Sequence, residues 1–459
     1  MPHQIDQLPV DIQSRIFHKL EQASKSAQSA TIYSVTEVTA PDVNRPIRVT
    51  NSVNKKALRQ SLQQNGTHLM EDLNFCVRLG NLDNDDSSIG PGKSGVSTAA
   101  REIISGIHTL DQKNINLEYD FGLGTKLEPD VKVFGQSRDE EALLQLENEQ
   151  TWRRLLVDTW NTLTANHTAT HLSMKSFVPV WSSAFYSTAF RQFLARLDRL
   201  DIHVSGMKNG HRSINTVPAY NDSLQSLLKV YFLRASSLKH LSLHASQSAP
   251  LGARGNYHIP LSLKATQLPA LEHLSLKNCF IGFELAHFIN GHRSTLETLE
   301  LDNCYAYRGT YDGPDSGGMQ WAPFFALINK PGMKLRRLVI NDAHIPLTID
   351  DKRLEKYNPD TANEPEDVKN VRRAQRREPR KRLFLYAYLR DYSGELWMNK
   401  DSIVAAFETG DDQSAYDELM ARVQGNAVGE TSIVGAEDHS IVKKQTPVDE
   451  GVEIFELSA

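Results

Sequence analysis

The stretch LEHLSLKNC (residues 271–279) returns 25 residues later as LETLELDNC (residues 296–304), with leucine and cysteine at the same positions. Leu274 and Leu276 alternate with polar residues, which is the two-residue period of a β-strand that buries one face. One short strand cannot bury its apolar side chains alone, but neighbouring strands with the same pattern can share one apolar layer. The repeated frame therefore predicts an array of short parallel strands.

Further copies of this frame occur on both sides of the pair. The steps between successive copies range from 25 to 41 residues, so several repeats must carry insertions. Between the frames, residues 283–299 and 322–338 space apolar residues as a helix does. The sequence therefore predicts an α/β fold in which a strand, a turn and a helix alternate. The further copies contain Leu172 and Met174, Leu200 and Ile202, Leu241 and Leu243, Leu338 and Ile340, and an outlying copy contains Leu73 and Phe75.

The frame resembles the leucine-rich repeat, whose motif is L-x-x-L-x-L-x-x-N/C. The resemblance implies an irregular solenoid with parallel strands on its concave side and helices outside. Cys279 and Cys304 would then pack inside the turn that follows each strand. The alternative is an ordinary α/β sheet whose strands happen to be rich in leucine.

The N-terminal stretch IDQLPVDIQSRIFHKL (residues 5–20) has proline early and then an isoleucine-leucine stripe at four-residue spacing, which predicts an amphipathic helix. It resembles the first helix of an F-box, which binds a Skp-type adaptor of cullin-RING ubiquitin ligases. Residues 21–50 contain two prolines and no tryptophan, so this F-box would be incomplete. The alternative is a helix that caps the array. The resemblance implies adaptor contacts by Leu8, Pro9, Ile12, Ile16, Phe17 and Leu20.

The remaining segments suggest where the parts of the chain begin and end. A helix is expected over residues 139–163. The basic run at residues 372–382 is either a nuclear import or nucleic-acid signal or, as we favour, part of a solvated insertion. The expected parts are an F-box-like helical segment (1–50), the repeat array (51–345) with a polar loop near 81–98, a charged insertion or linker (346–382), a helical C-terminal cap (383–424) and a tail (425–459).

Composition excludes several classes of protein. The net charge of -5 gives no general attraction to nucleic acid or to anionic membranes. The three cysteines form no CxxC pair, which argues against a disulfide framework and favours a reducing compartment, the cytoplasm or the nucleus. No apolar run is long enough to span a membrane. We expect no membrane or nucleic-acid partner.

The polar positions of the predicted strands are the candidate binding residues. They would line the concave side, where five of the 16 histidines of the chain fall, so this surface is expected to be basic or histidine-bearing with an acidic break. It could hold an acidic or phosphorylated partner segment, and its histidines could make binding depend on pH. The candidates are His171, Lys175, Arg199, His203, His240, His244, His273, Lys277, Glu300, Asp302 and Arg337.

No catalytic motif accompanies these residues. The sequence lacks G-x-S-x-G and H-E-x-x-H, and we expect neither enzymatic activity nor a cofactor nor a metal. The principal hypothesis is a substrate-recognition subunit of an SCF-type ubiquitin ligase, with a Skp-type adaptor at the N-terminal helix and an unidentified protein substrate on the repeats. The alternative is a leucine-rich-repeat scaffold that binds a protein without recruiting a ligase.

Overall fold

The computed structural model describes most of the chain from the first predicted strands to the C-terminal helices. The F-box-like residues Leu8 to Leu20 and most of the polar loop near 81–98 lie outside the described residues. The described residues are 47–50, 72–78, 96–105, 114–120, 134, 138–206, 208–209, 211–253, 255–307, 319–341 and 365–429.

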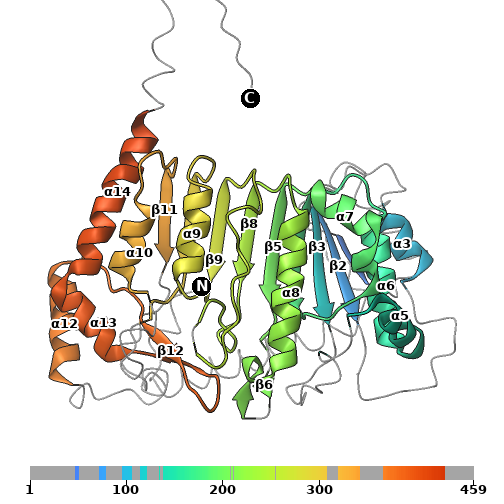
Figure 1. Ribbon diagram of the computed structural model, residues 1–459, viewed down its shortest axis with the longest axis horizontal. Coiled ribbons are helices and arrows are strands. Elements are labelled where there is room, and N and C mark those ends of the chain that lie inside the picture. Colours follow the sequence, from blue (N-terminus) through green and yellow to red (C-terminus); the bar gives the residue numbers. More distant parts are fainter. Residues whose placement is uncertain are drawn as a thin grey trace, which may run out of the picture. The chain divides into compact units, whose positions relative to one another are not determined.

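A nine-stranded parallel sheet dominates the described residues, and its strand order follows the order along the chain, leaving aside one small hairpin (Figure 1). Successive strands of the sheet are hydrogen-bonded to each other, so each repeat is placed directly beside the next. This confirms the predicted α/β class with parallel strands. The strands are β1 (Ile47–Thr50), β2 (Asp72–Arg78), β3 (Asn114–Asp120), β4 (His171–Phe177), β5 (Arg199–Val204), β8 (His240–His244), β9 (His273–Lys277), β10 (Thr298–Asp302) and β11 (Arg337–Asn341), and the hairpin joins β6 (Lys208–Asn209) to β7 (Arg212–Ser213).

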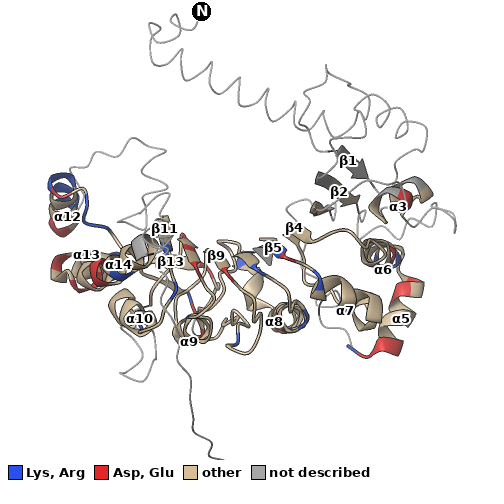
Figure 2. Cartoon of the chain, turned by 90° about the horizontal axis from the view of Figure 1, so that it is seen from above, with Lys and Arg blue, Asp and Glu red and all other residues tan. Residues whose placement is uncertain are grey.

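Helices fill most of the connections between the strands. Figure 2 shows α7, α8, α9 and α10 on the same side of the sheet. Their starts follow local rules: the Ser187 hydroxyl accepts a hydrogen bond from the Phe190 amide at the start of α7, and Pro218 opens α8. The helices are α3 (Thr98–Ile104), α5 (Glu140–Glu149), α6 (Thr151–Thr164), α7 (Thr188–Ala195), α8 (Pro218–Arg234), α9 (Phe283–Gly291) and α10 (Trp321–Ile328), with short 3-10 turns at Ser183–Tyr186 and Ile214–Thr216.

Two rows of apolar residues run across the sheet, because the strands pair without a shift at these positions. Leu274 lies opposite Leu241 on one side and Leu299 on the other, and Leu299 lies opposite Leu338. This confirms the predicted stacking of the leucine frames. From β3 onward the side chains of both rows are buried: Ile115, Leu172, Leu200, Leu241, Leu274, Leu299 and Leu338 in the first, and Leu117, Met174, Ile202, Leu243, Leu276, Leu301 and Ile340 in the second.

The turns after β9 and β10 are built alike. Asn278 and Asn303 have φ of 53° and 48°, in the left-handed region that asparagine tolerates better than most residues. The next residue turns its thiol inward: Cys279 Sγ lies 3.3 Å from the carbonyl oxygen of Lys277, and Cys304 Sγ lies 3.6 Å from that of Leu276. The predicted inward packing of both cysteines is therefore confirmed.

The helix expected over residues 139–163 is two helices, α5 and α6, separated at Gln150. Gln150 has an extended backbone, and its side-chain oxygen accepts a hydrogen bond from Arg153 Nε at 2.9 Å. Glu147, near the end of α5, is buried and accepts hydrogen bonds from the amide and hydroxyl of Ser183. The break therefore coincides with a local contact at Gln150 and with a long-range contact between Glu147 and Ser183, and apolar spacing alone reveals neither.

The C-terminal segment packs against the last helix and strand of the sheet region. Asp412 accepts hydrogen bonds from the Ala322 amide and the Tyr386 hydroxyl, and Asn426 donates to the carbonyl oxygens of Met333 and Leu335. The long helix ends at Gly429 rather than at the expected 424. The segment comprises α12 (Glu366–Arg377), β12 (Ala387–Leu389), β13 (Leu396–Met398), α13 (Lys400–Thr409) and α14 (Asp411–Gly429).

The structure refines two other expected boundaries. Residues Ile47–Thr50, expected in the N-terminal segment, form β1 and pair with β2. Part of the charged insertion is the helix α12, which begins with Glu366 and Asp367 and ends with Arg376 and Arg377, an arrangement that suits the helix dipole.

Candidate binding face

The alternate positions of the strands, between the two leucine rows, form the surface that we call the polar face. Because the strands are in register, equivalent polar residues form three rows across the sheet, of which the third is interrupted between β4 and β5 by a register shift after Met174. The first row is Asn114, His171, Arg199, His240, His273, Thr298 and Arg337; the second is Asn116, Ser173, Asp201, Ser242, Ser275, Glu300 and Val339; the third contains Glu118 and Lys175 on β3 and β4, and His203, His244, Lys277, Asp302 and Asn341 on β5 to β11. All eleven candidate residues from the sequence lie on this face.

Asp201 is the centre of a hydrogen-bonded group at the β4–β5 side of the polar face. His171 Nε2 lies 2.9 Å from Asp201 Oδ2, Arg199 Nε lies 3.1 Å from the same oxygen, and His171 Nδ1 lies 3.1 Å from Asn114 Oδ1. Burial acts to raise the pKa of Asp201, but the hydrogen bond from His171 and the charge of Arg199 outweigh it and lower the pKa. Asp201 is therefore a stable carboxylate that orients its neighbours.

Four histidines of the polar face form two stacked pairs. The rings of His240 and His273 are parallel within 5°, with centroids 4.1 Å apart, and the centroids of His203 and His244 are 4.3 Å apart. Burial, together with the neighbouring His203, lowers the pKa of His244 to about 4, and burial is also the main cause that lowers the pKa of His203 and His240. These three imidazoles are therefore neutral at pH 7.

The cations of the face are largely paired with carboxylates. Lys277 Nζ lies 2.5 Å from Asp302 Oδ2, and Arg337 Nη2 lies 3.2 Å from Glu300 Oε1. Together with the neutral histidines, these pairs give a surface of alternating charge. The expected histidine-bearing surface with an acidic break at Glu300 and Asp302 lies where the frame placed it, and the structure adds that most of its cations are neutralised by carboxylates.

Two histidines of the first row and the glutamate that precedes β9 form a group that could hold a metal ion. Single ligand atoms of His240, Glu272 and His273 all lie within 4.8 Å of one another, and the three residues are half-buried. The sequence contained a signal for the histidine pair that no local motif describes. When the frames are aligned, each histidine precedes the leucine at the same position of its frame. Only the register of the strands places the glutamate beside both rings.

Burial keeps the thiol of Cys279 in its neutral form. Burial is the main cause that raises the pKa of Cys279 to about 12, so it is a neutral thiol at pH 7. Cys76, Cys279 and Cys304 are all buried, and none of the three is in a disulfide. Cys279 therefore contributes packing in its turn rather than reactivity.

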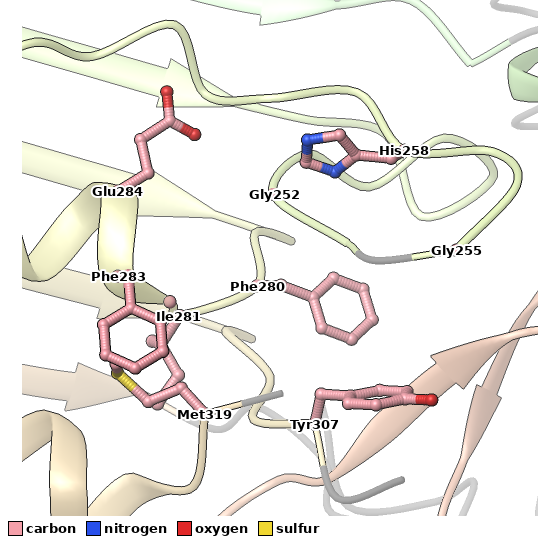
Figure 3. Close-up of a pocket in the computed structure, with 10 residues that line it drawn as sticks. Gly252, Gly255, His258, Phe280, Ile281, Phe283, Glu284, Tyr307 and Met319 are labelled. Carbon is pink, nitrogen blue, oxygen red and sulfur yellow. The ribbon is translucent and has the colours of Figure 1, made fainter. Parts of the chain in front are cut away.

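A cavity of about 400 Å³ lies beside the loops that follow β8, β9 and β10 (Figure 3). Phe280, Phe283, Tyr307 and Met319 contribute much of its lining. Its titratable groups are held by the backbone: the Glu284 carboxylate accepts hydrogen bonds from the amides of Leu261 and Leu263, and His258 Nδ1 contacts the carbonyl oxygen of Ala253. Glu284 and His258 thus hold the loop through backbone contacts; burial raises the pKa of Glu284, and the charge of His258 acts against that rise.

The basic run at 372–382 has structural partners in its described part. Arg373 pairs with Glu366 at 2.8 Å, Lys381 lies over the ring of Phe407, and Arg382 lies over the ring of Tyr416. Such contacts are consistent with the interpretation of the run as part of the fold's surface.

No protein-family model matches the chain, and no curated protein matches it. Among the helices that the structure describes, none has both the length and the apolar character needed to cross a membrane.

Proposed function

We propose that the chain is an irregular leucine-rich-repeat protein that holds a partner protein on its polar face. Three features support the repeat assignment: strand order that follows chain order, leucine rows in register, and the matching Asn–Cys turns after β9 and β10. A doubly wound α/β enzyme would instead reverse its strand order and place its site at that reversal.

The observation that carries the proposal is the position of the polar face, whose mostly half-buried or exposed side chains alternate with the buried leucine rows. Figure 2 shows α7 to α10 on one side of the strands, while the rows from His171 to Arg337 occupy the other face of the sheet. Many of these side chains are already positioned by ion pairs or by stacking, so binding would cost little side-chain entropy. The alternating charge of the polar face suits a partner surface of mixed charge rather than a purely acidic segment.

The test compares charge reversals on the two sides of the sheet. Lys175 and Arg337 are exposed on the polar face, and Arg234 is exposed at the end of α8. Proteins captured by the intact chain from its native cells are identified by mass spectrometry, and capture is repeated with Lys175→Glu/Arg337→Glu and with the control Arg234→Glu. We expect the double variant alone to lose its partner. Equal capture by all three chains would contradict binding on this face.

Recruitment of a ligase is the more specific hypothesis, and it rests on the sequence of residues 5–20. The polar face would then hold the substrate of an SCF-type ubiquitin ligase near a charged conjugating enzyme, so the chain would contribute proximity rather than bond chemistry. Purified chain is mixed with a Skp-type adaptor and compared with a chain in which Leu8, Pro9 and Ile12 are changed to alanine. Adaptor binding that these changes abolish supports the ligase subunit. If the unmodified chain does not bind the adaptor, the scaffold alternative holds.

A further inference from the structure

We propose that His240, Glu272 and His273 bind a divalent transition-metal ion of the Zn²⁺ type on the polar face. Two imidazoles and one carboxylate are a common protein ligand set for zinc, and imidazole nitrogen favours Zn²⁺ and related late transition metals over Mg²⁺ or Ca²⁺. No local sequence motif marks this site. Its three ligands come from the starts of two neighbouring strands, which only the fold brings together.

The sheet places the three side chains together before any ion arrives. His240 and His273 occupy opposite positions of β8 and β9, and Glu272 directly precedes His273. The backbone fixes both strand starts: the His240 amide donates to the carbonyl oxygen of Asp198, and the His273 amide donates to that of Lys239, both at 2.9 Å. A site held by strands in this way needs only side-chain movement to close.

The ring nitrogens of this pair are available, unlike those of other histidines in the fold. Among the described residues, none donates or accepts a hydrogen bond at the ring nitrogens of His240 or His273. His171 uses both of its nitrogens, on Asn114 and Asp201, and His292 uses both on backbone carbonyl oxygens. Hydrogen bonds within the fold account for the ring nitrogens of His171 and His292, but not for those of His240 and His273.

Glu272 is also only weakly engaged. Its carboxylate lies 3.8 Å from Lys239 Nζ, and both side chains are substantially exposed, so this ion pair contributes little stability. A metal ion would replace that contact with a direct bond. The lysine could remain nearby without blocking the site, because its long side chain can turn to solvent.

Closing the site requires a modest rearrangement. Metal–ligand bonds of about 2.1 Å in a tetrahedron bring ligand atoms to about 3.4 Å from one another, which is closer than the present limit of 4.8 Å. The parallel rings must also tilt so that their lone pairs converge, which rotation about the side-chain bonds supplies. Three protein ligands leave one position open to water or to a side chain of a bound partner.

The stacked pair His203 and His244 is a matched control on the same face. Its rings are also in contact, at 4.3 Å between centroids, but it does not form a three-ligand group with a carboxylate in the described part of the chain. Random binding of metal to surface histidines would therefore affect both pairs alike. A built site would depend on His240, Glu272 and His273 and not on His203 or His244.

The experiment titrates the tag-free full chain with Zn²⁺ by calorimetry and with Co²⁺ by visible absorption. We expect His240→Ala and His273→Ala each to lose one equivalent of Zn²⁺ and the Co²⁺ bands, and Glu272→Gln to bind Zn²⁺ about tenfold or more weakly. His244→Ala should match the parent chain. Circular dichroism checks folding, and His240→Gln, which keeps the side-chain volume, replaces His240→Ala if that variant unfolds.

Two outcomes would overturn the proposal. Unchanged stoichiometry and affinity in both His240→Ala and His273→Ala would place the ion elsewhere. An equal loss in His244→Ala would indicate diffuse binding to the histidines of the face rather than a site. Neither outcome depends on finding the partner protein, so the metal site and the proposed function can fail separately.

Discussion

The two faces of the parallel sheet use the same strands but are held by different forces. Leu274 on one face is 1% exposed and lies between two other leucines, whereas the adjacent His273 is half-buried and stacks on His240. The leucine rows hold the strands together through burial, which has no directional requirement. The polar face depends on directed contacts, so its residues can be changed with less cost to the fold.

The largest expected difference between the faces concerns the leucine rows. Leu274→Ala should lower the free energy of unfolding by about 2–5 kcal/mol, because it leaves a cavity between buried neighbours. Ser275→Ala, the next residue on the polar face, should change it by less than about 0.5 kcal/mol. Denaturant unfolding measures both. Similar losses for the two variants would erase the distinction between the faces.

Asp201 is the point where the polar face most resembles a core. Asp201→Asn should destabilise the chain by about 1–3 kcal/mol, since it removes the charge that holds His171 and Arg199. Asp302→Asn is the control, because Asp302 is more exposed and its main partner is Lys277. Because the pKa of Asp201 is lowered, the stability it contributes should be present above its ordinary pKa and lost as the pH falls through its lower folded value. An acid transition unchanged in Asp201→Asn would refute this role.

His244 should make stability, rather than partner binding, sensitive to acid. Its pKa of about 4 lies below the ordinary 6.5, so the unfolded chain binds more protons between these values. Stability should therefore be complete above pH 6.5 and fall as the pH drops toward 4. His244→Gln should reduce that loss by about 1 kcal/mol once solvent screening is included. Because His244 stays neutral from pH 6 to 8, a pH-dependent partner affinity in that range would have to come from other groups.

The smallest effect is expected at the exposed edge of the polar face. Arg337→Ala breaks the ion pair between Arg337, whose side chain is 64% exposed, and Glu300, whose side chain is 35% exposed. The variant should lower the free energy of unfolding by at most about 1 kcal/mol. Raising the salt concentration should reduce the difference between variant and parent. A loss comparable to that of Leu274→Ala would show that ion pairs, too, hold the repeats together.

The sequence failed to predict some strands for an identifiable reason. β3 follows the same inward pattern, with Ile115 and Leu117 in the two apolar rows, but glutamine occupies the first leucine position of the frame at 112. A search for leucines overlooks such a strand, although its alternation is visible. In contrast, the buried positions Leu285, Phe288 and Ile289 of α9 agree with the spacing in the sequence.

By itself, the sequence determined the strands that carry the leucine frame, their inward leucines and the inward packing of Cys279 and Cys304, because side-chain alternation and turn preference are local properties. Only the tertiary structure decided the charge of the polar face, the break at Gln150 and the meeting of His240 with Glu272 and His273. These features depend on desolvation and on contacts between segments far apart in the chain. Parallel pairing without a shift turns a repeated local pattern into rows, and the partners within each row then set protonation and ligand geometry.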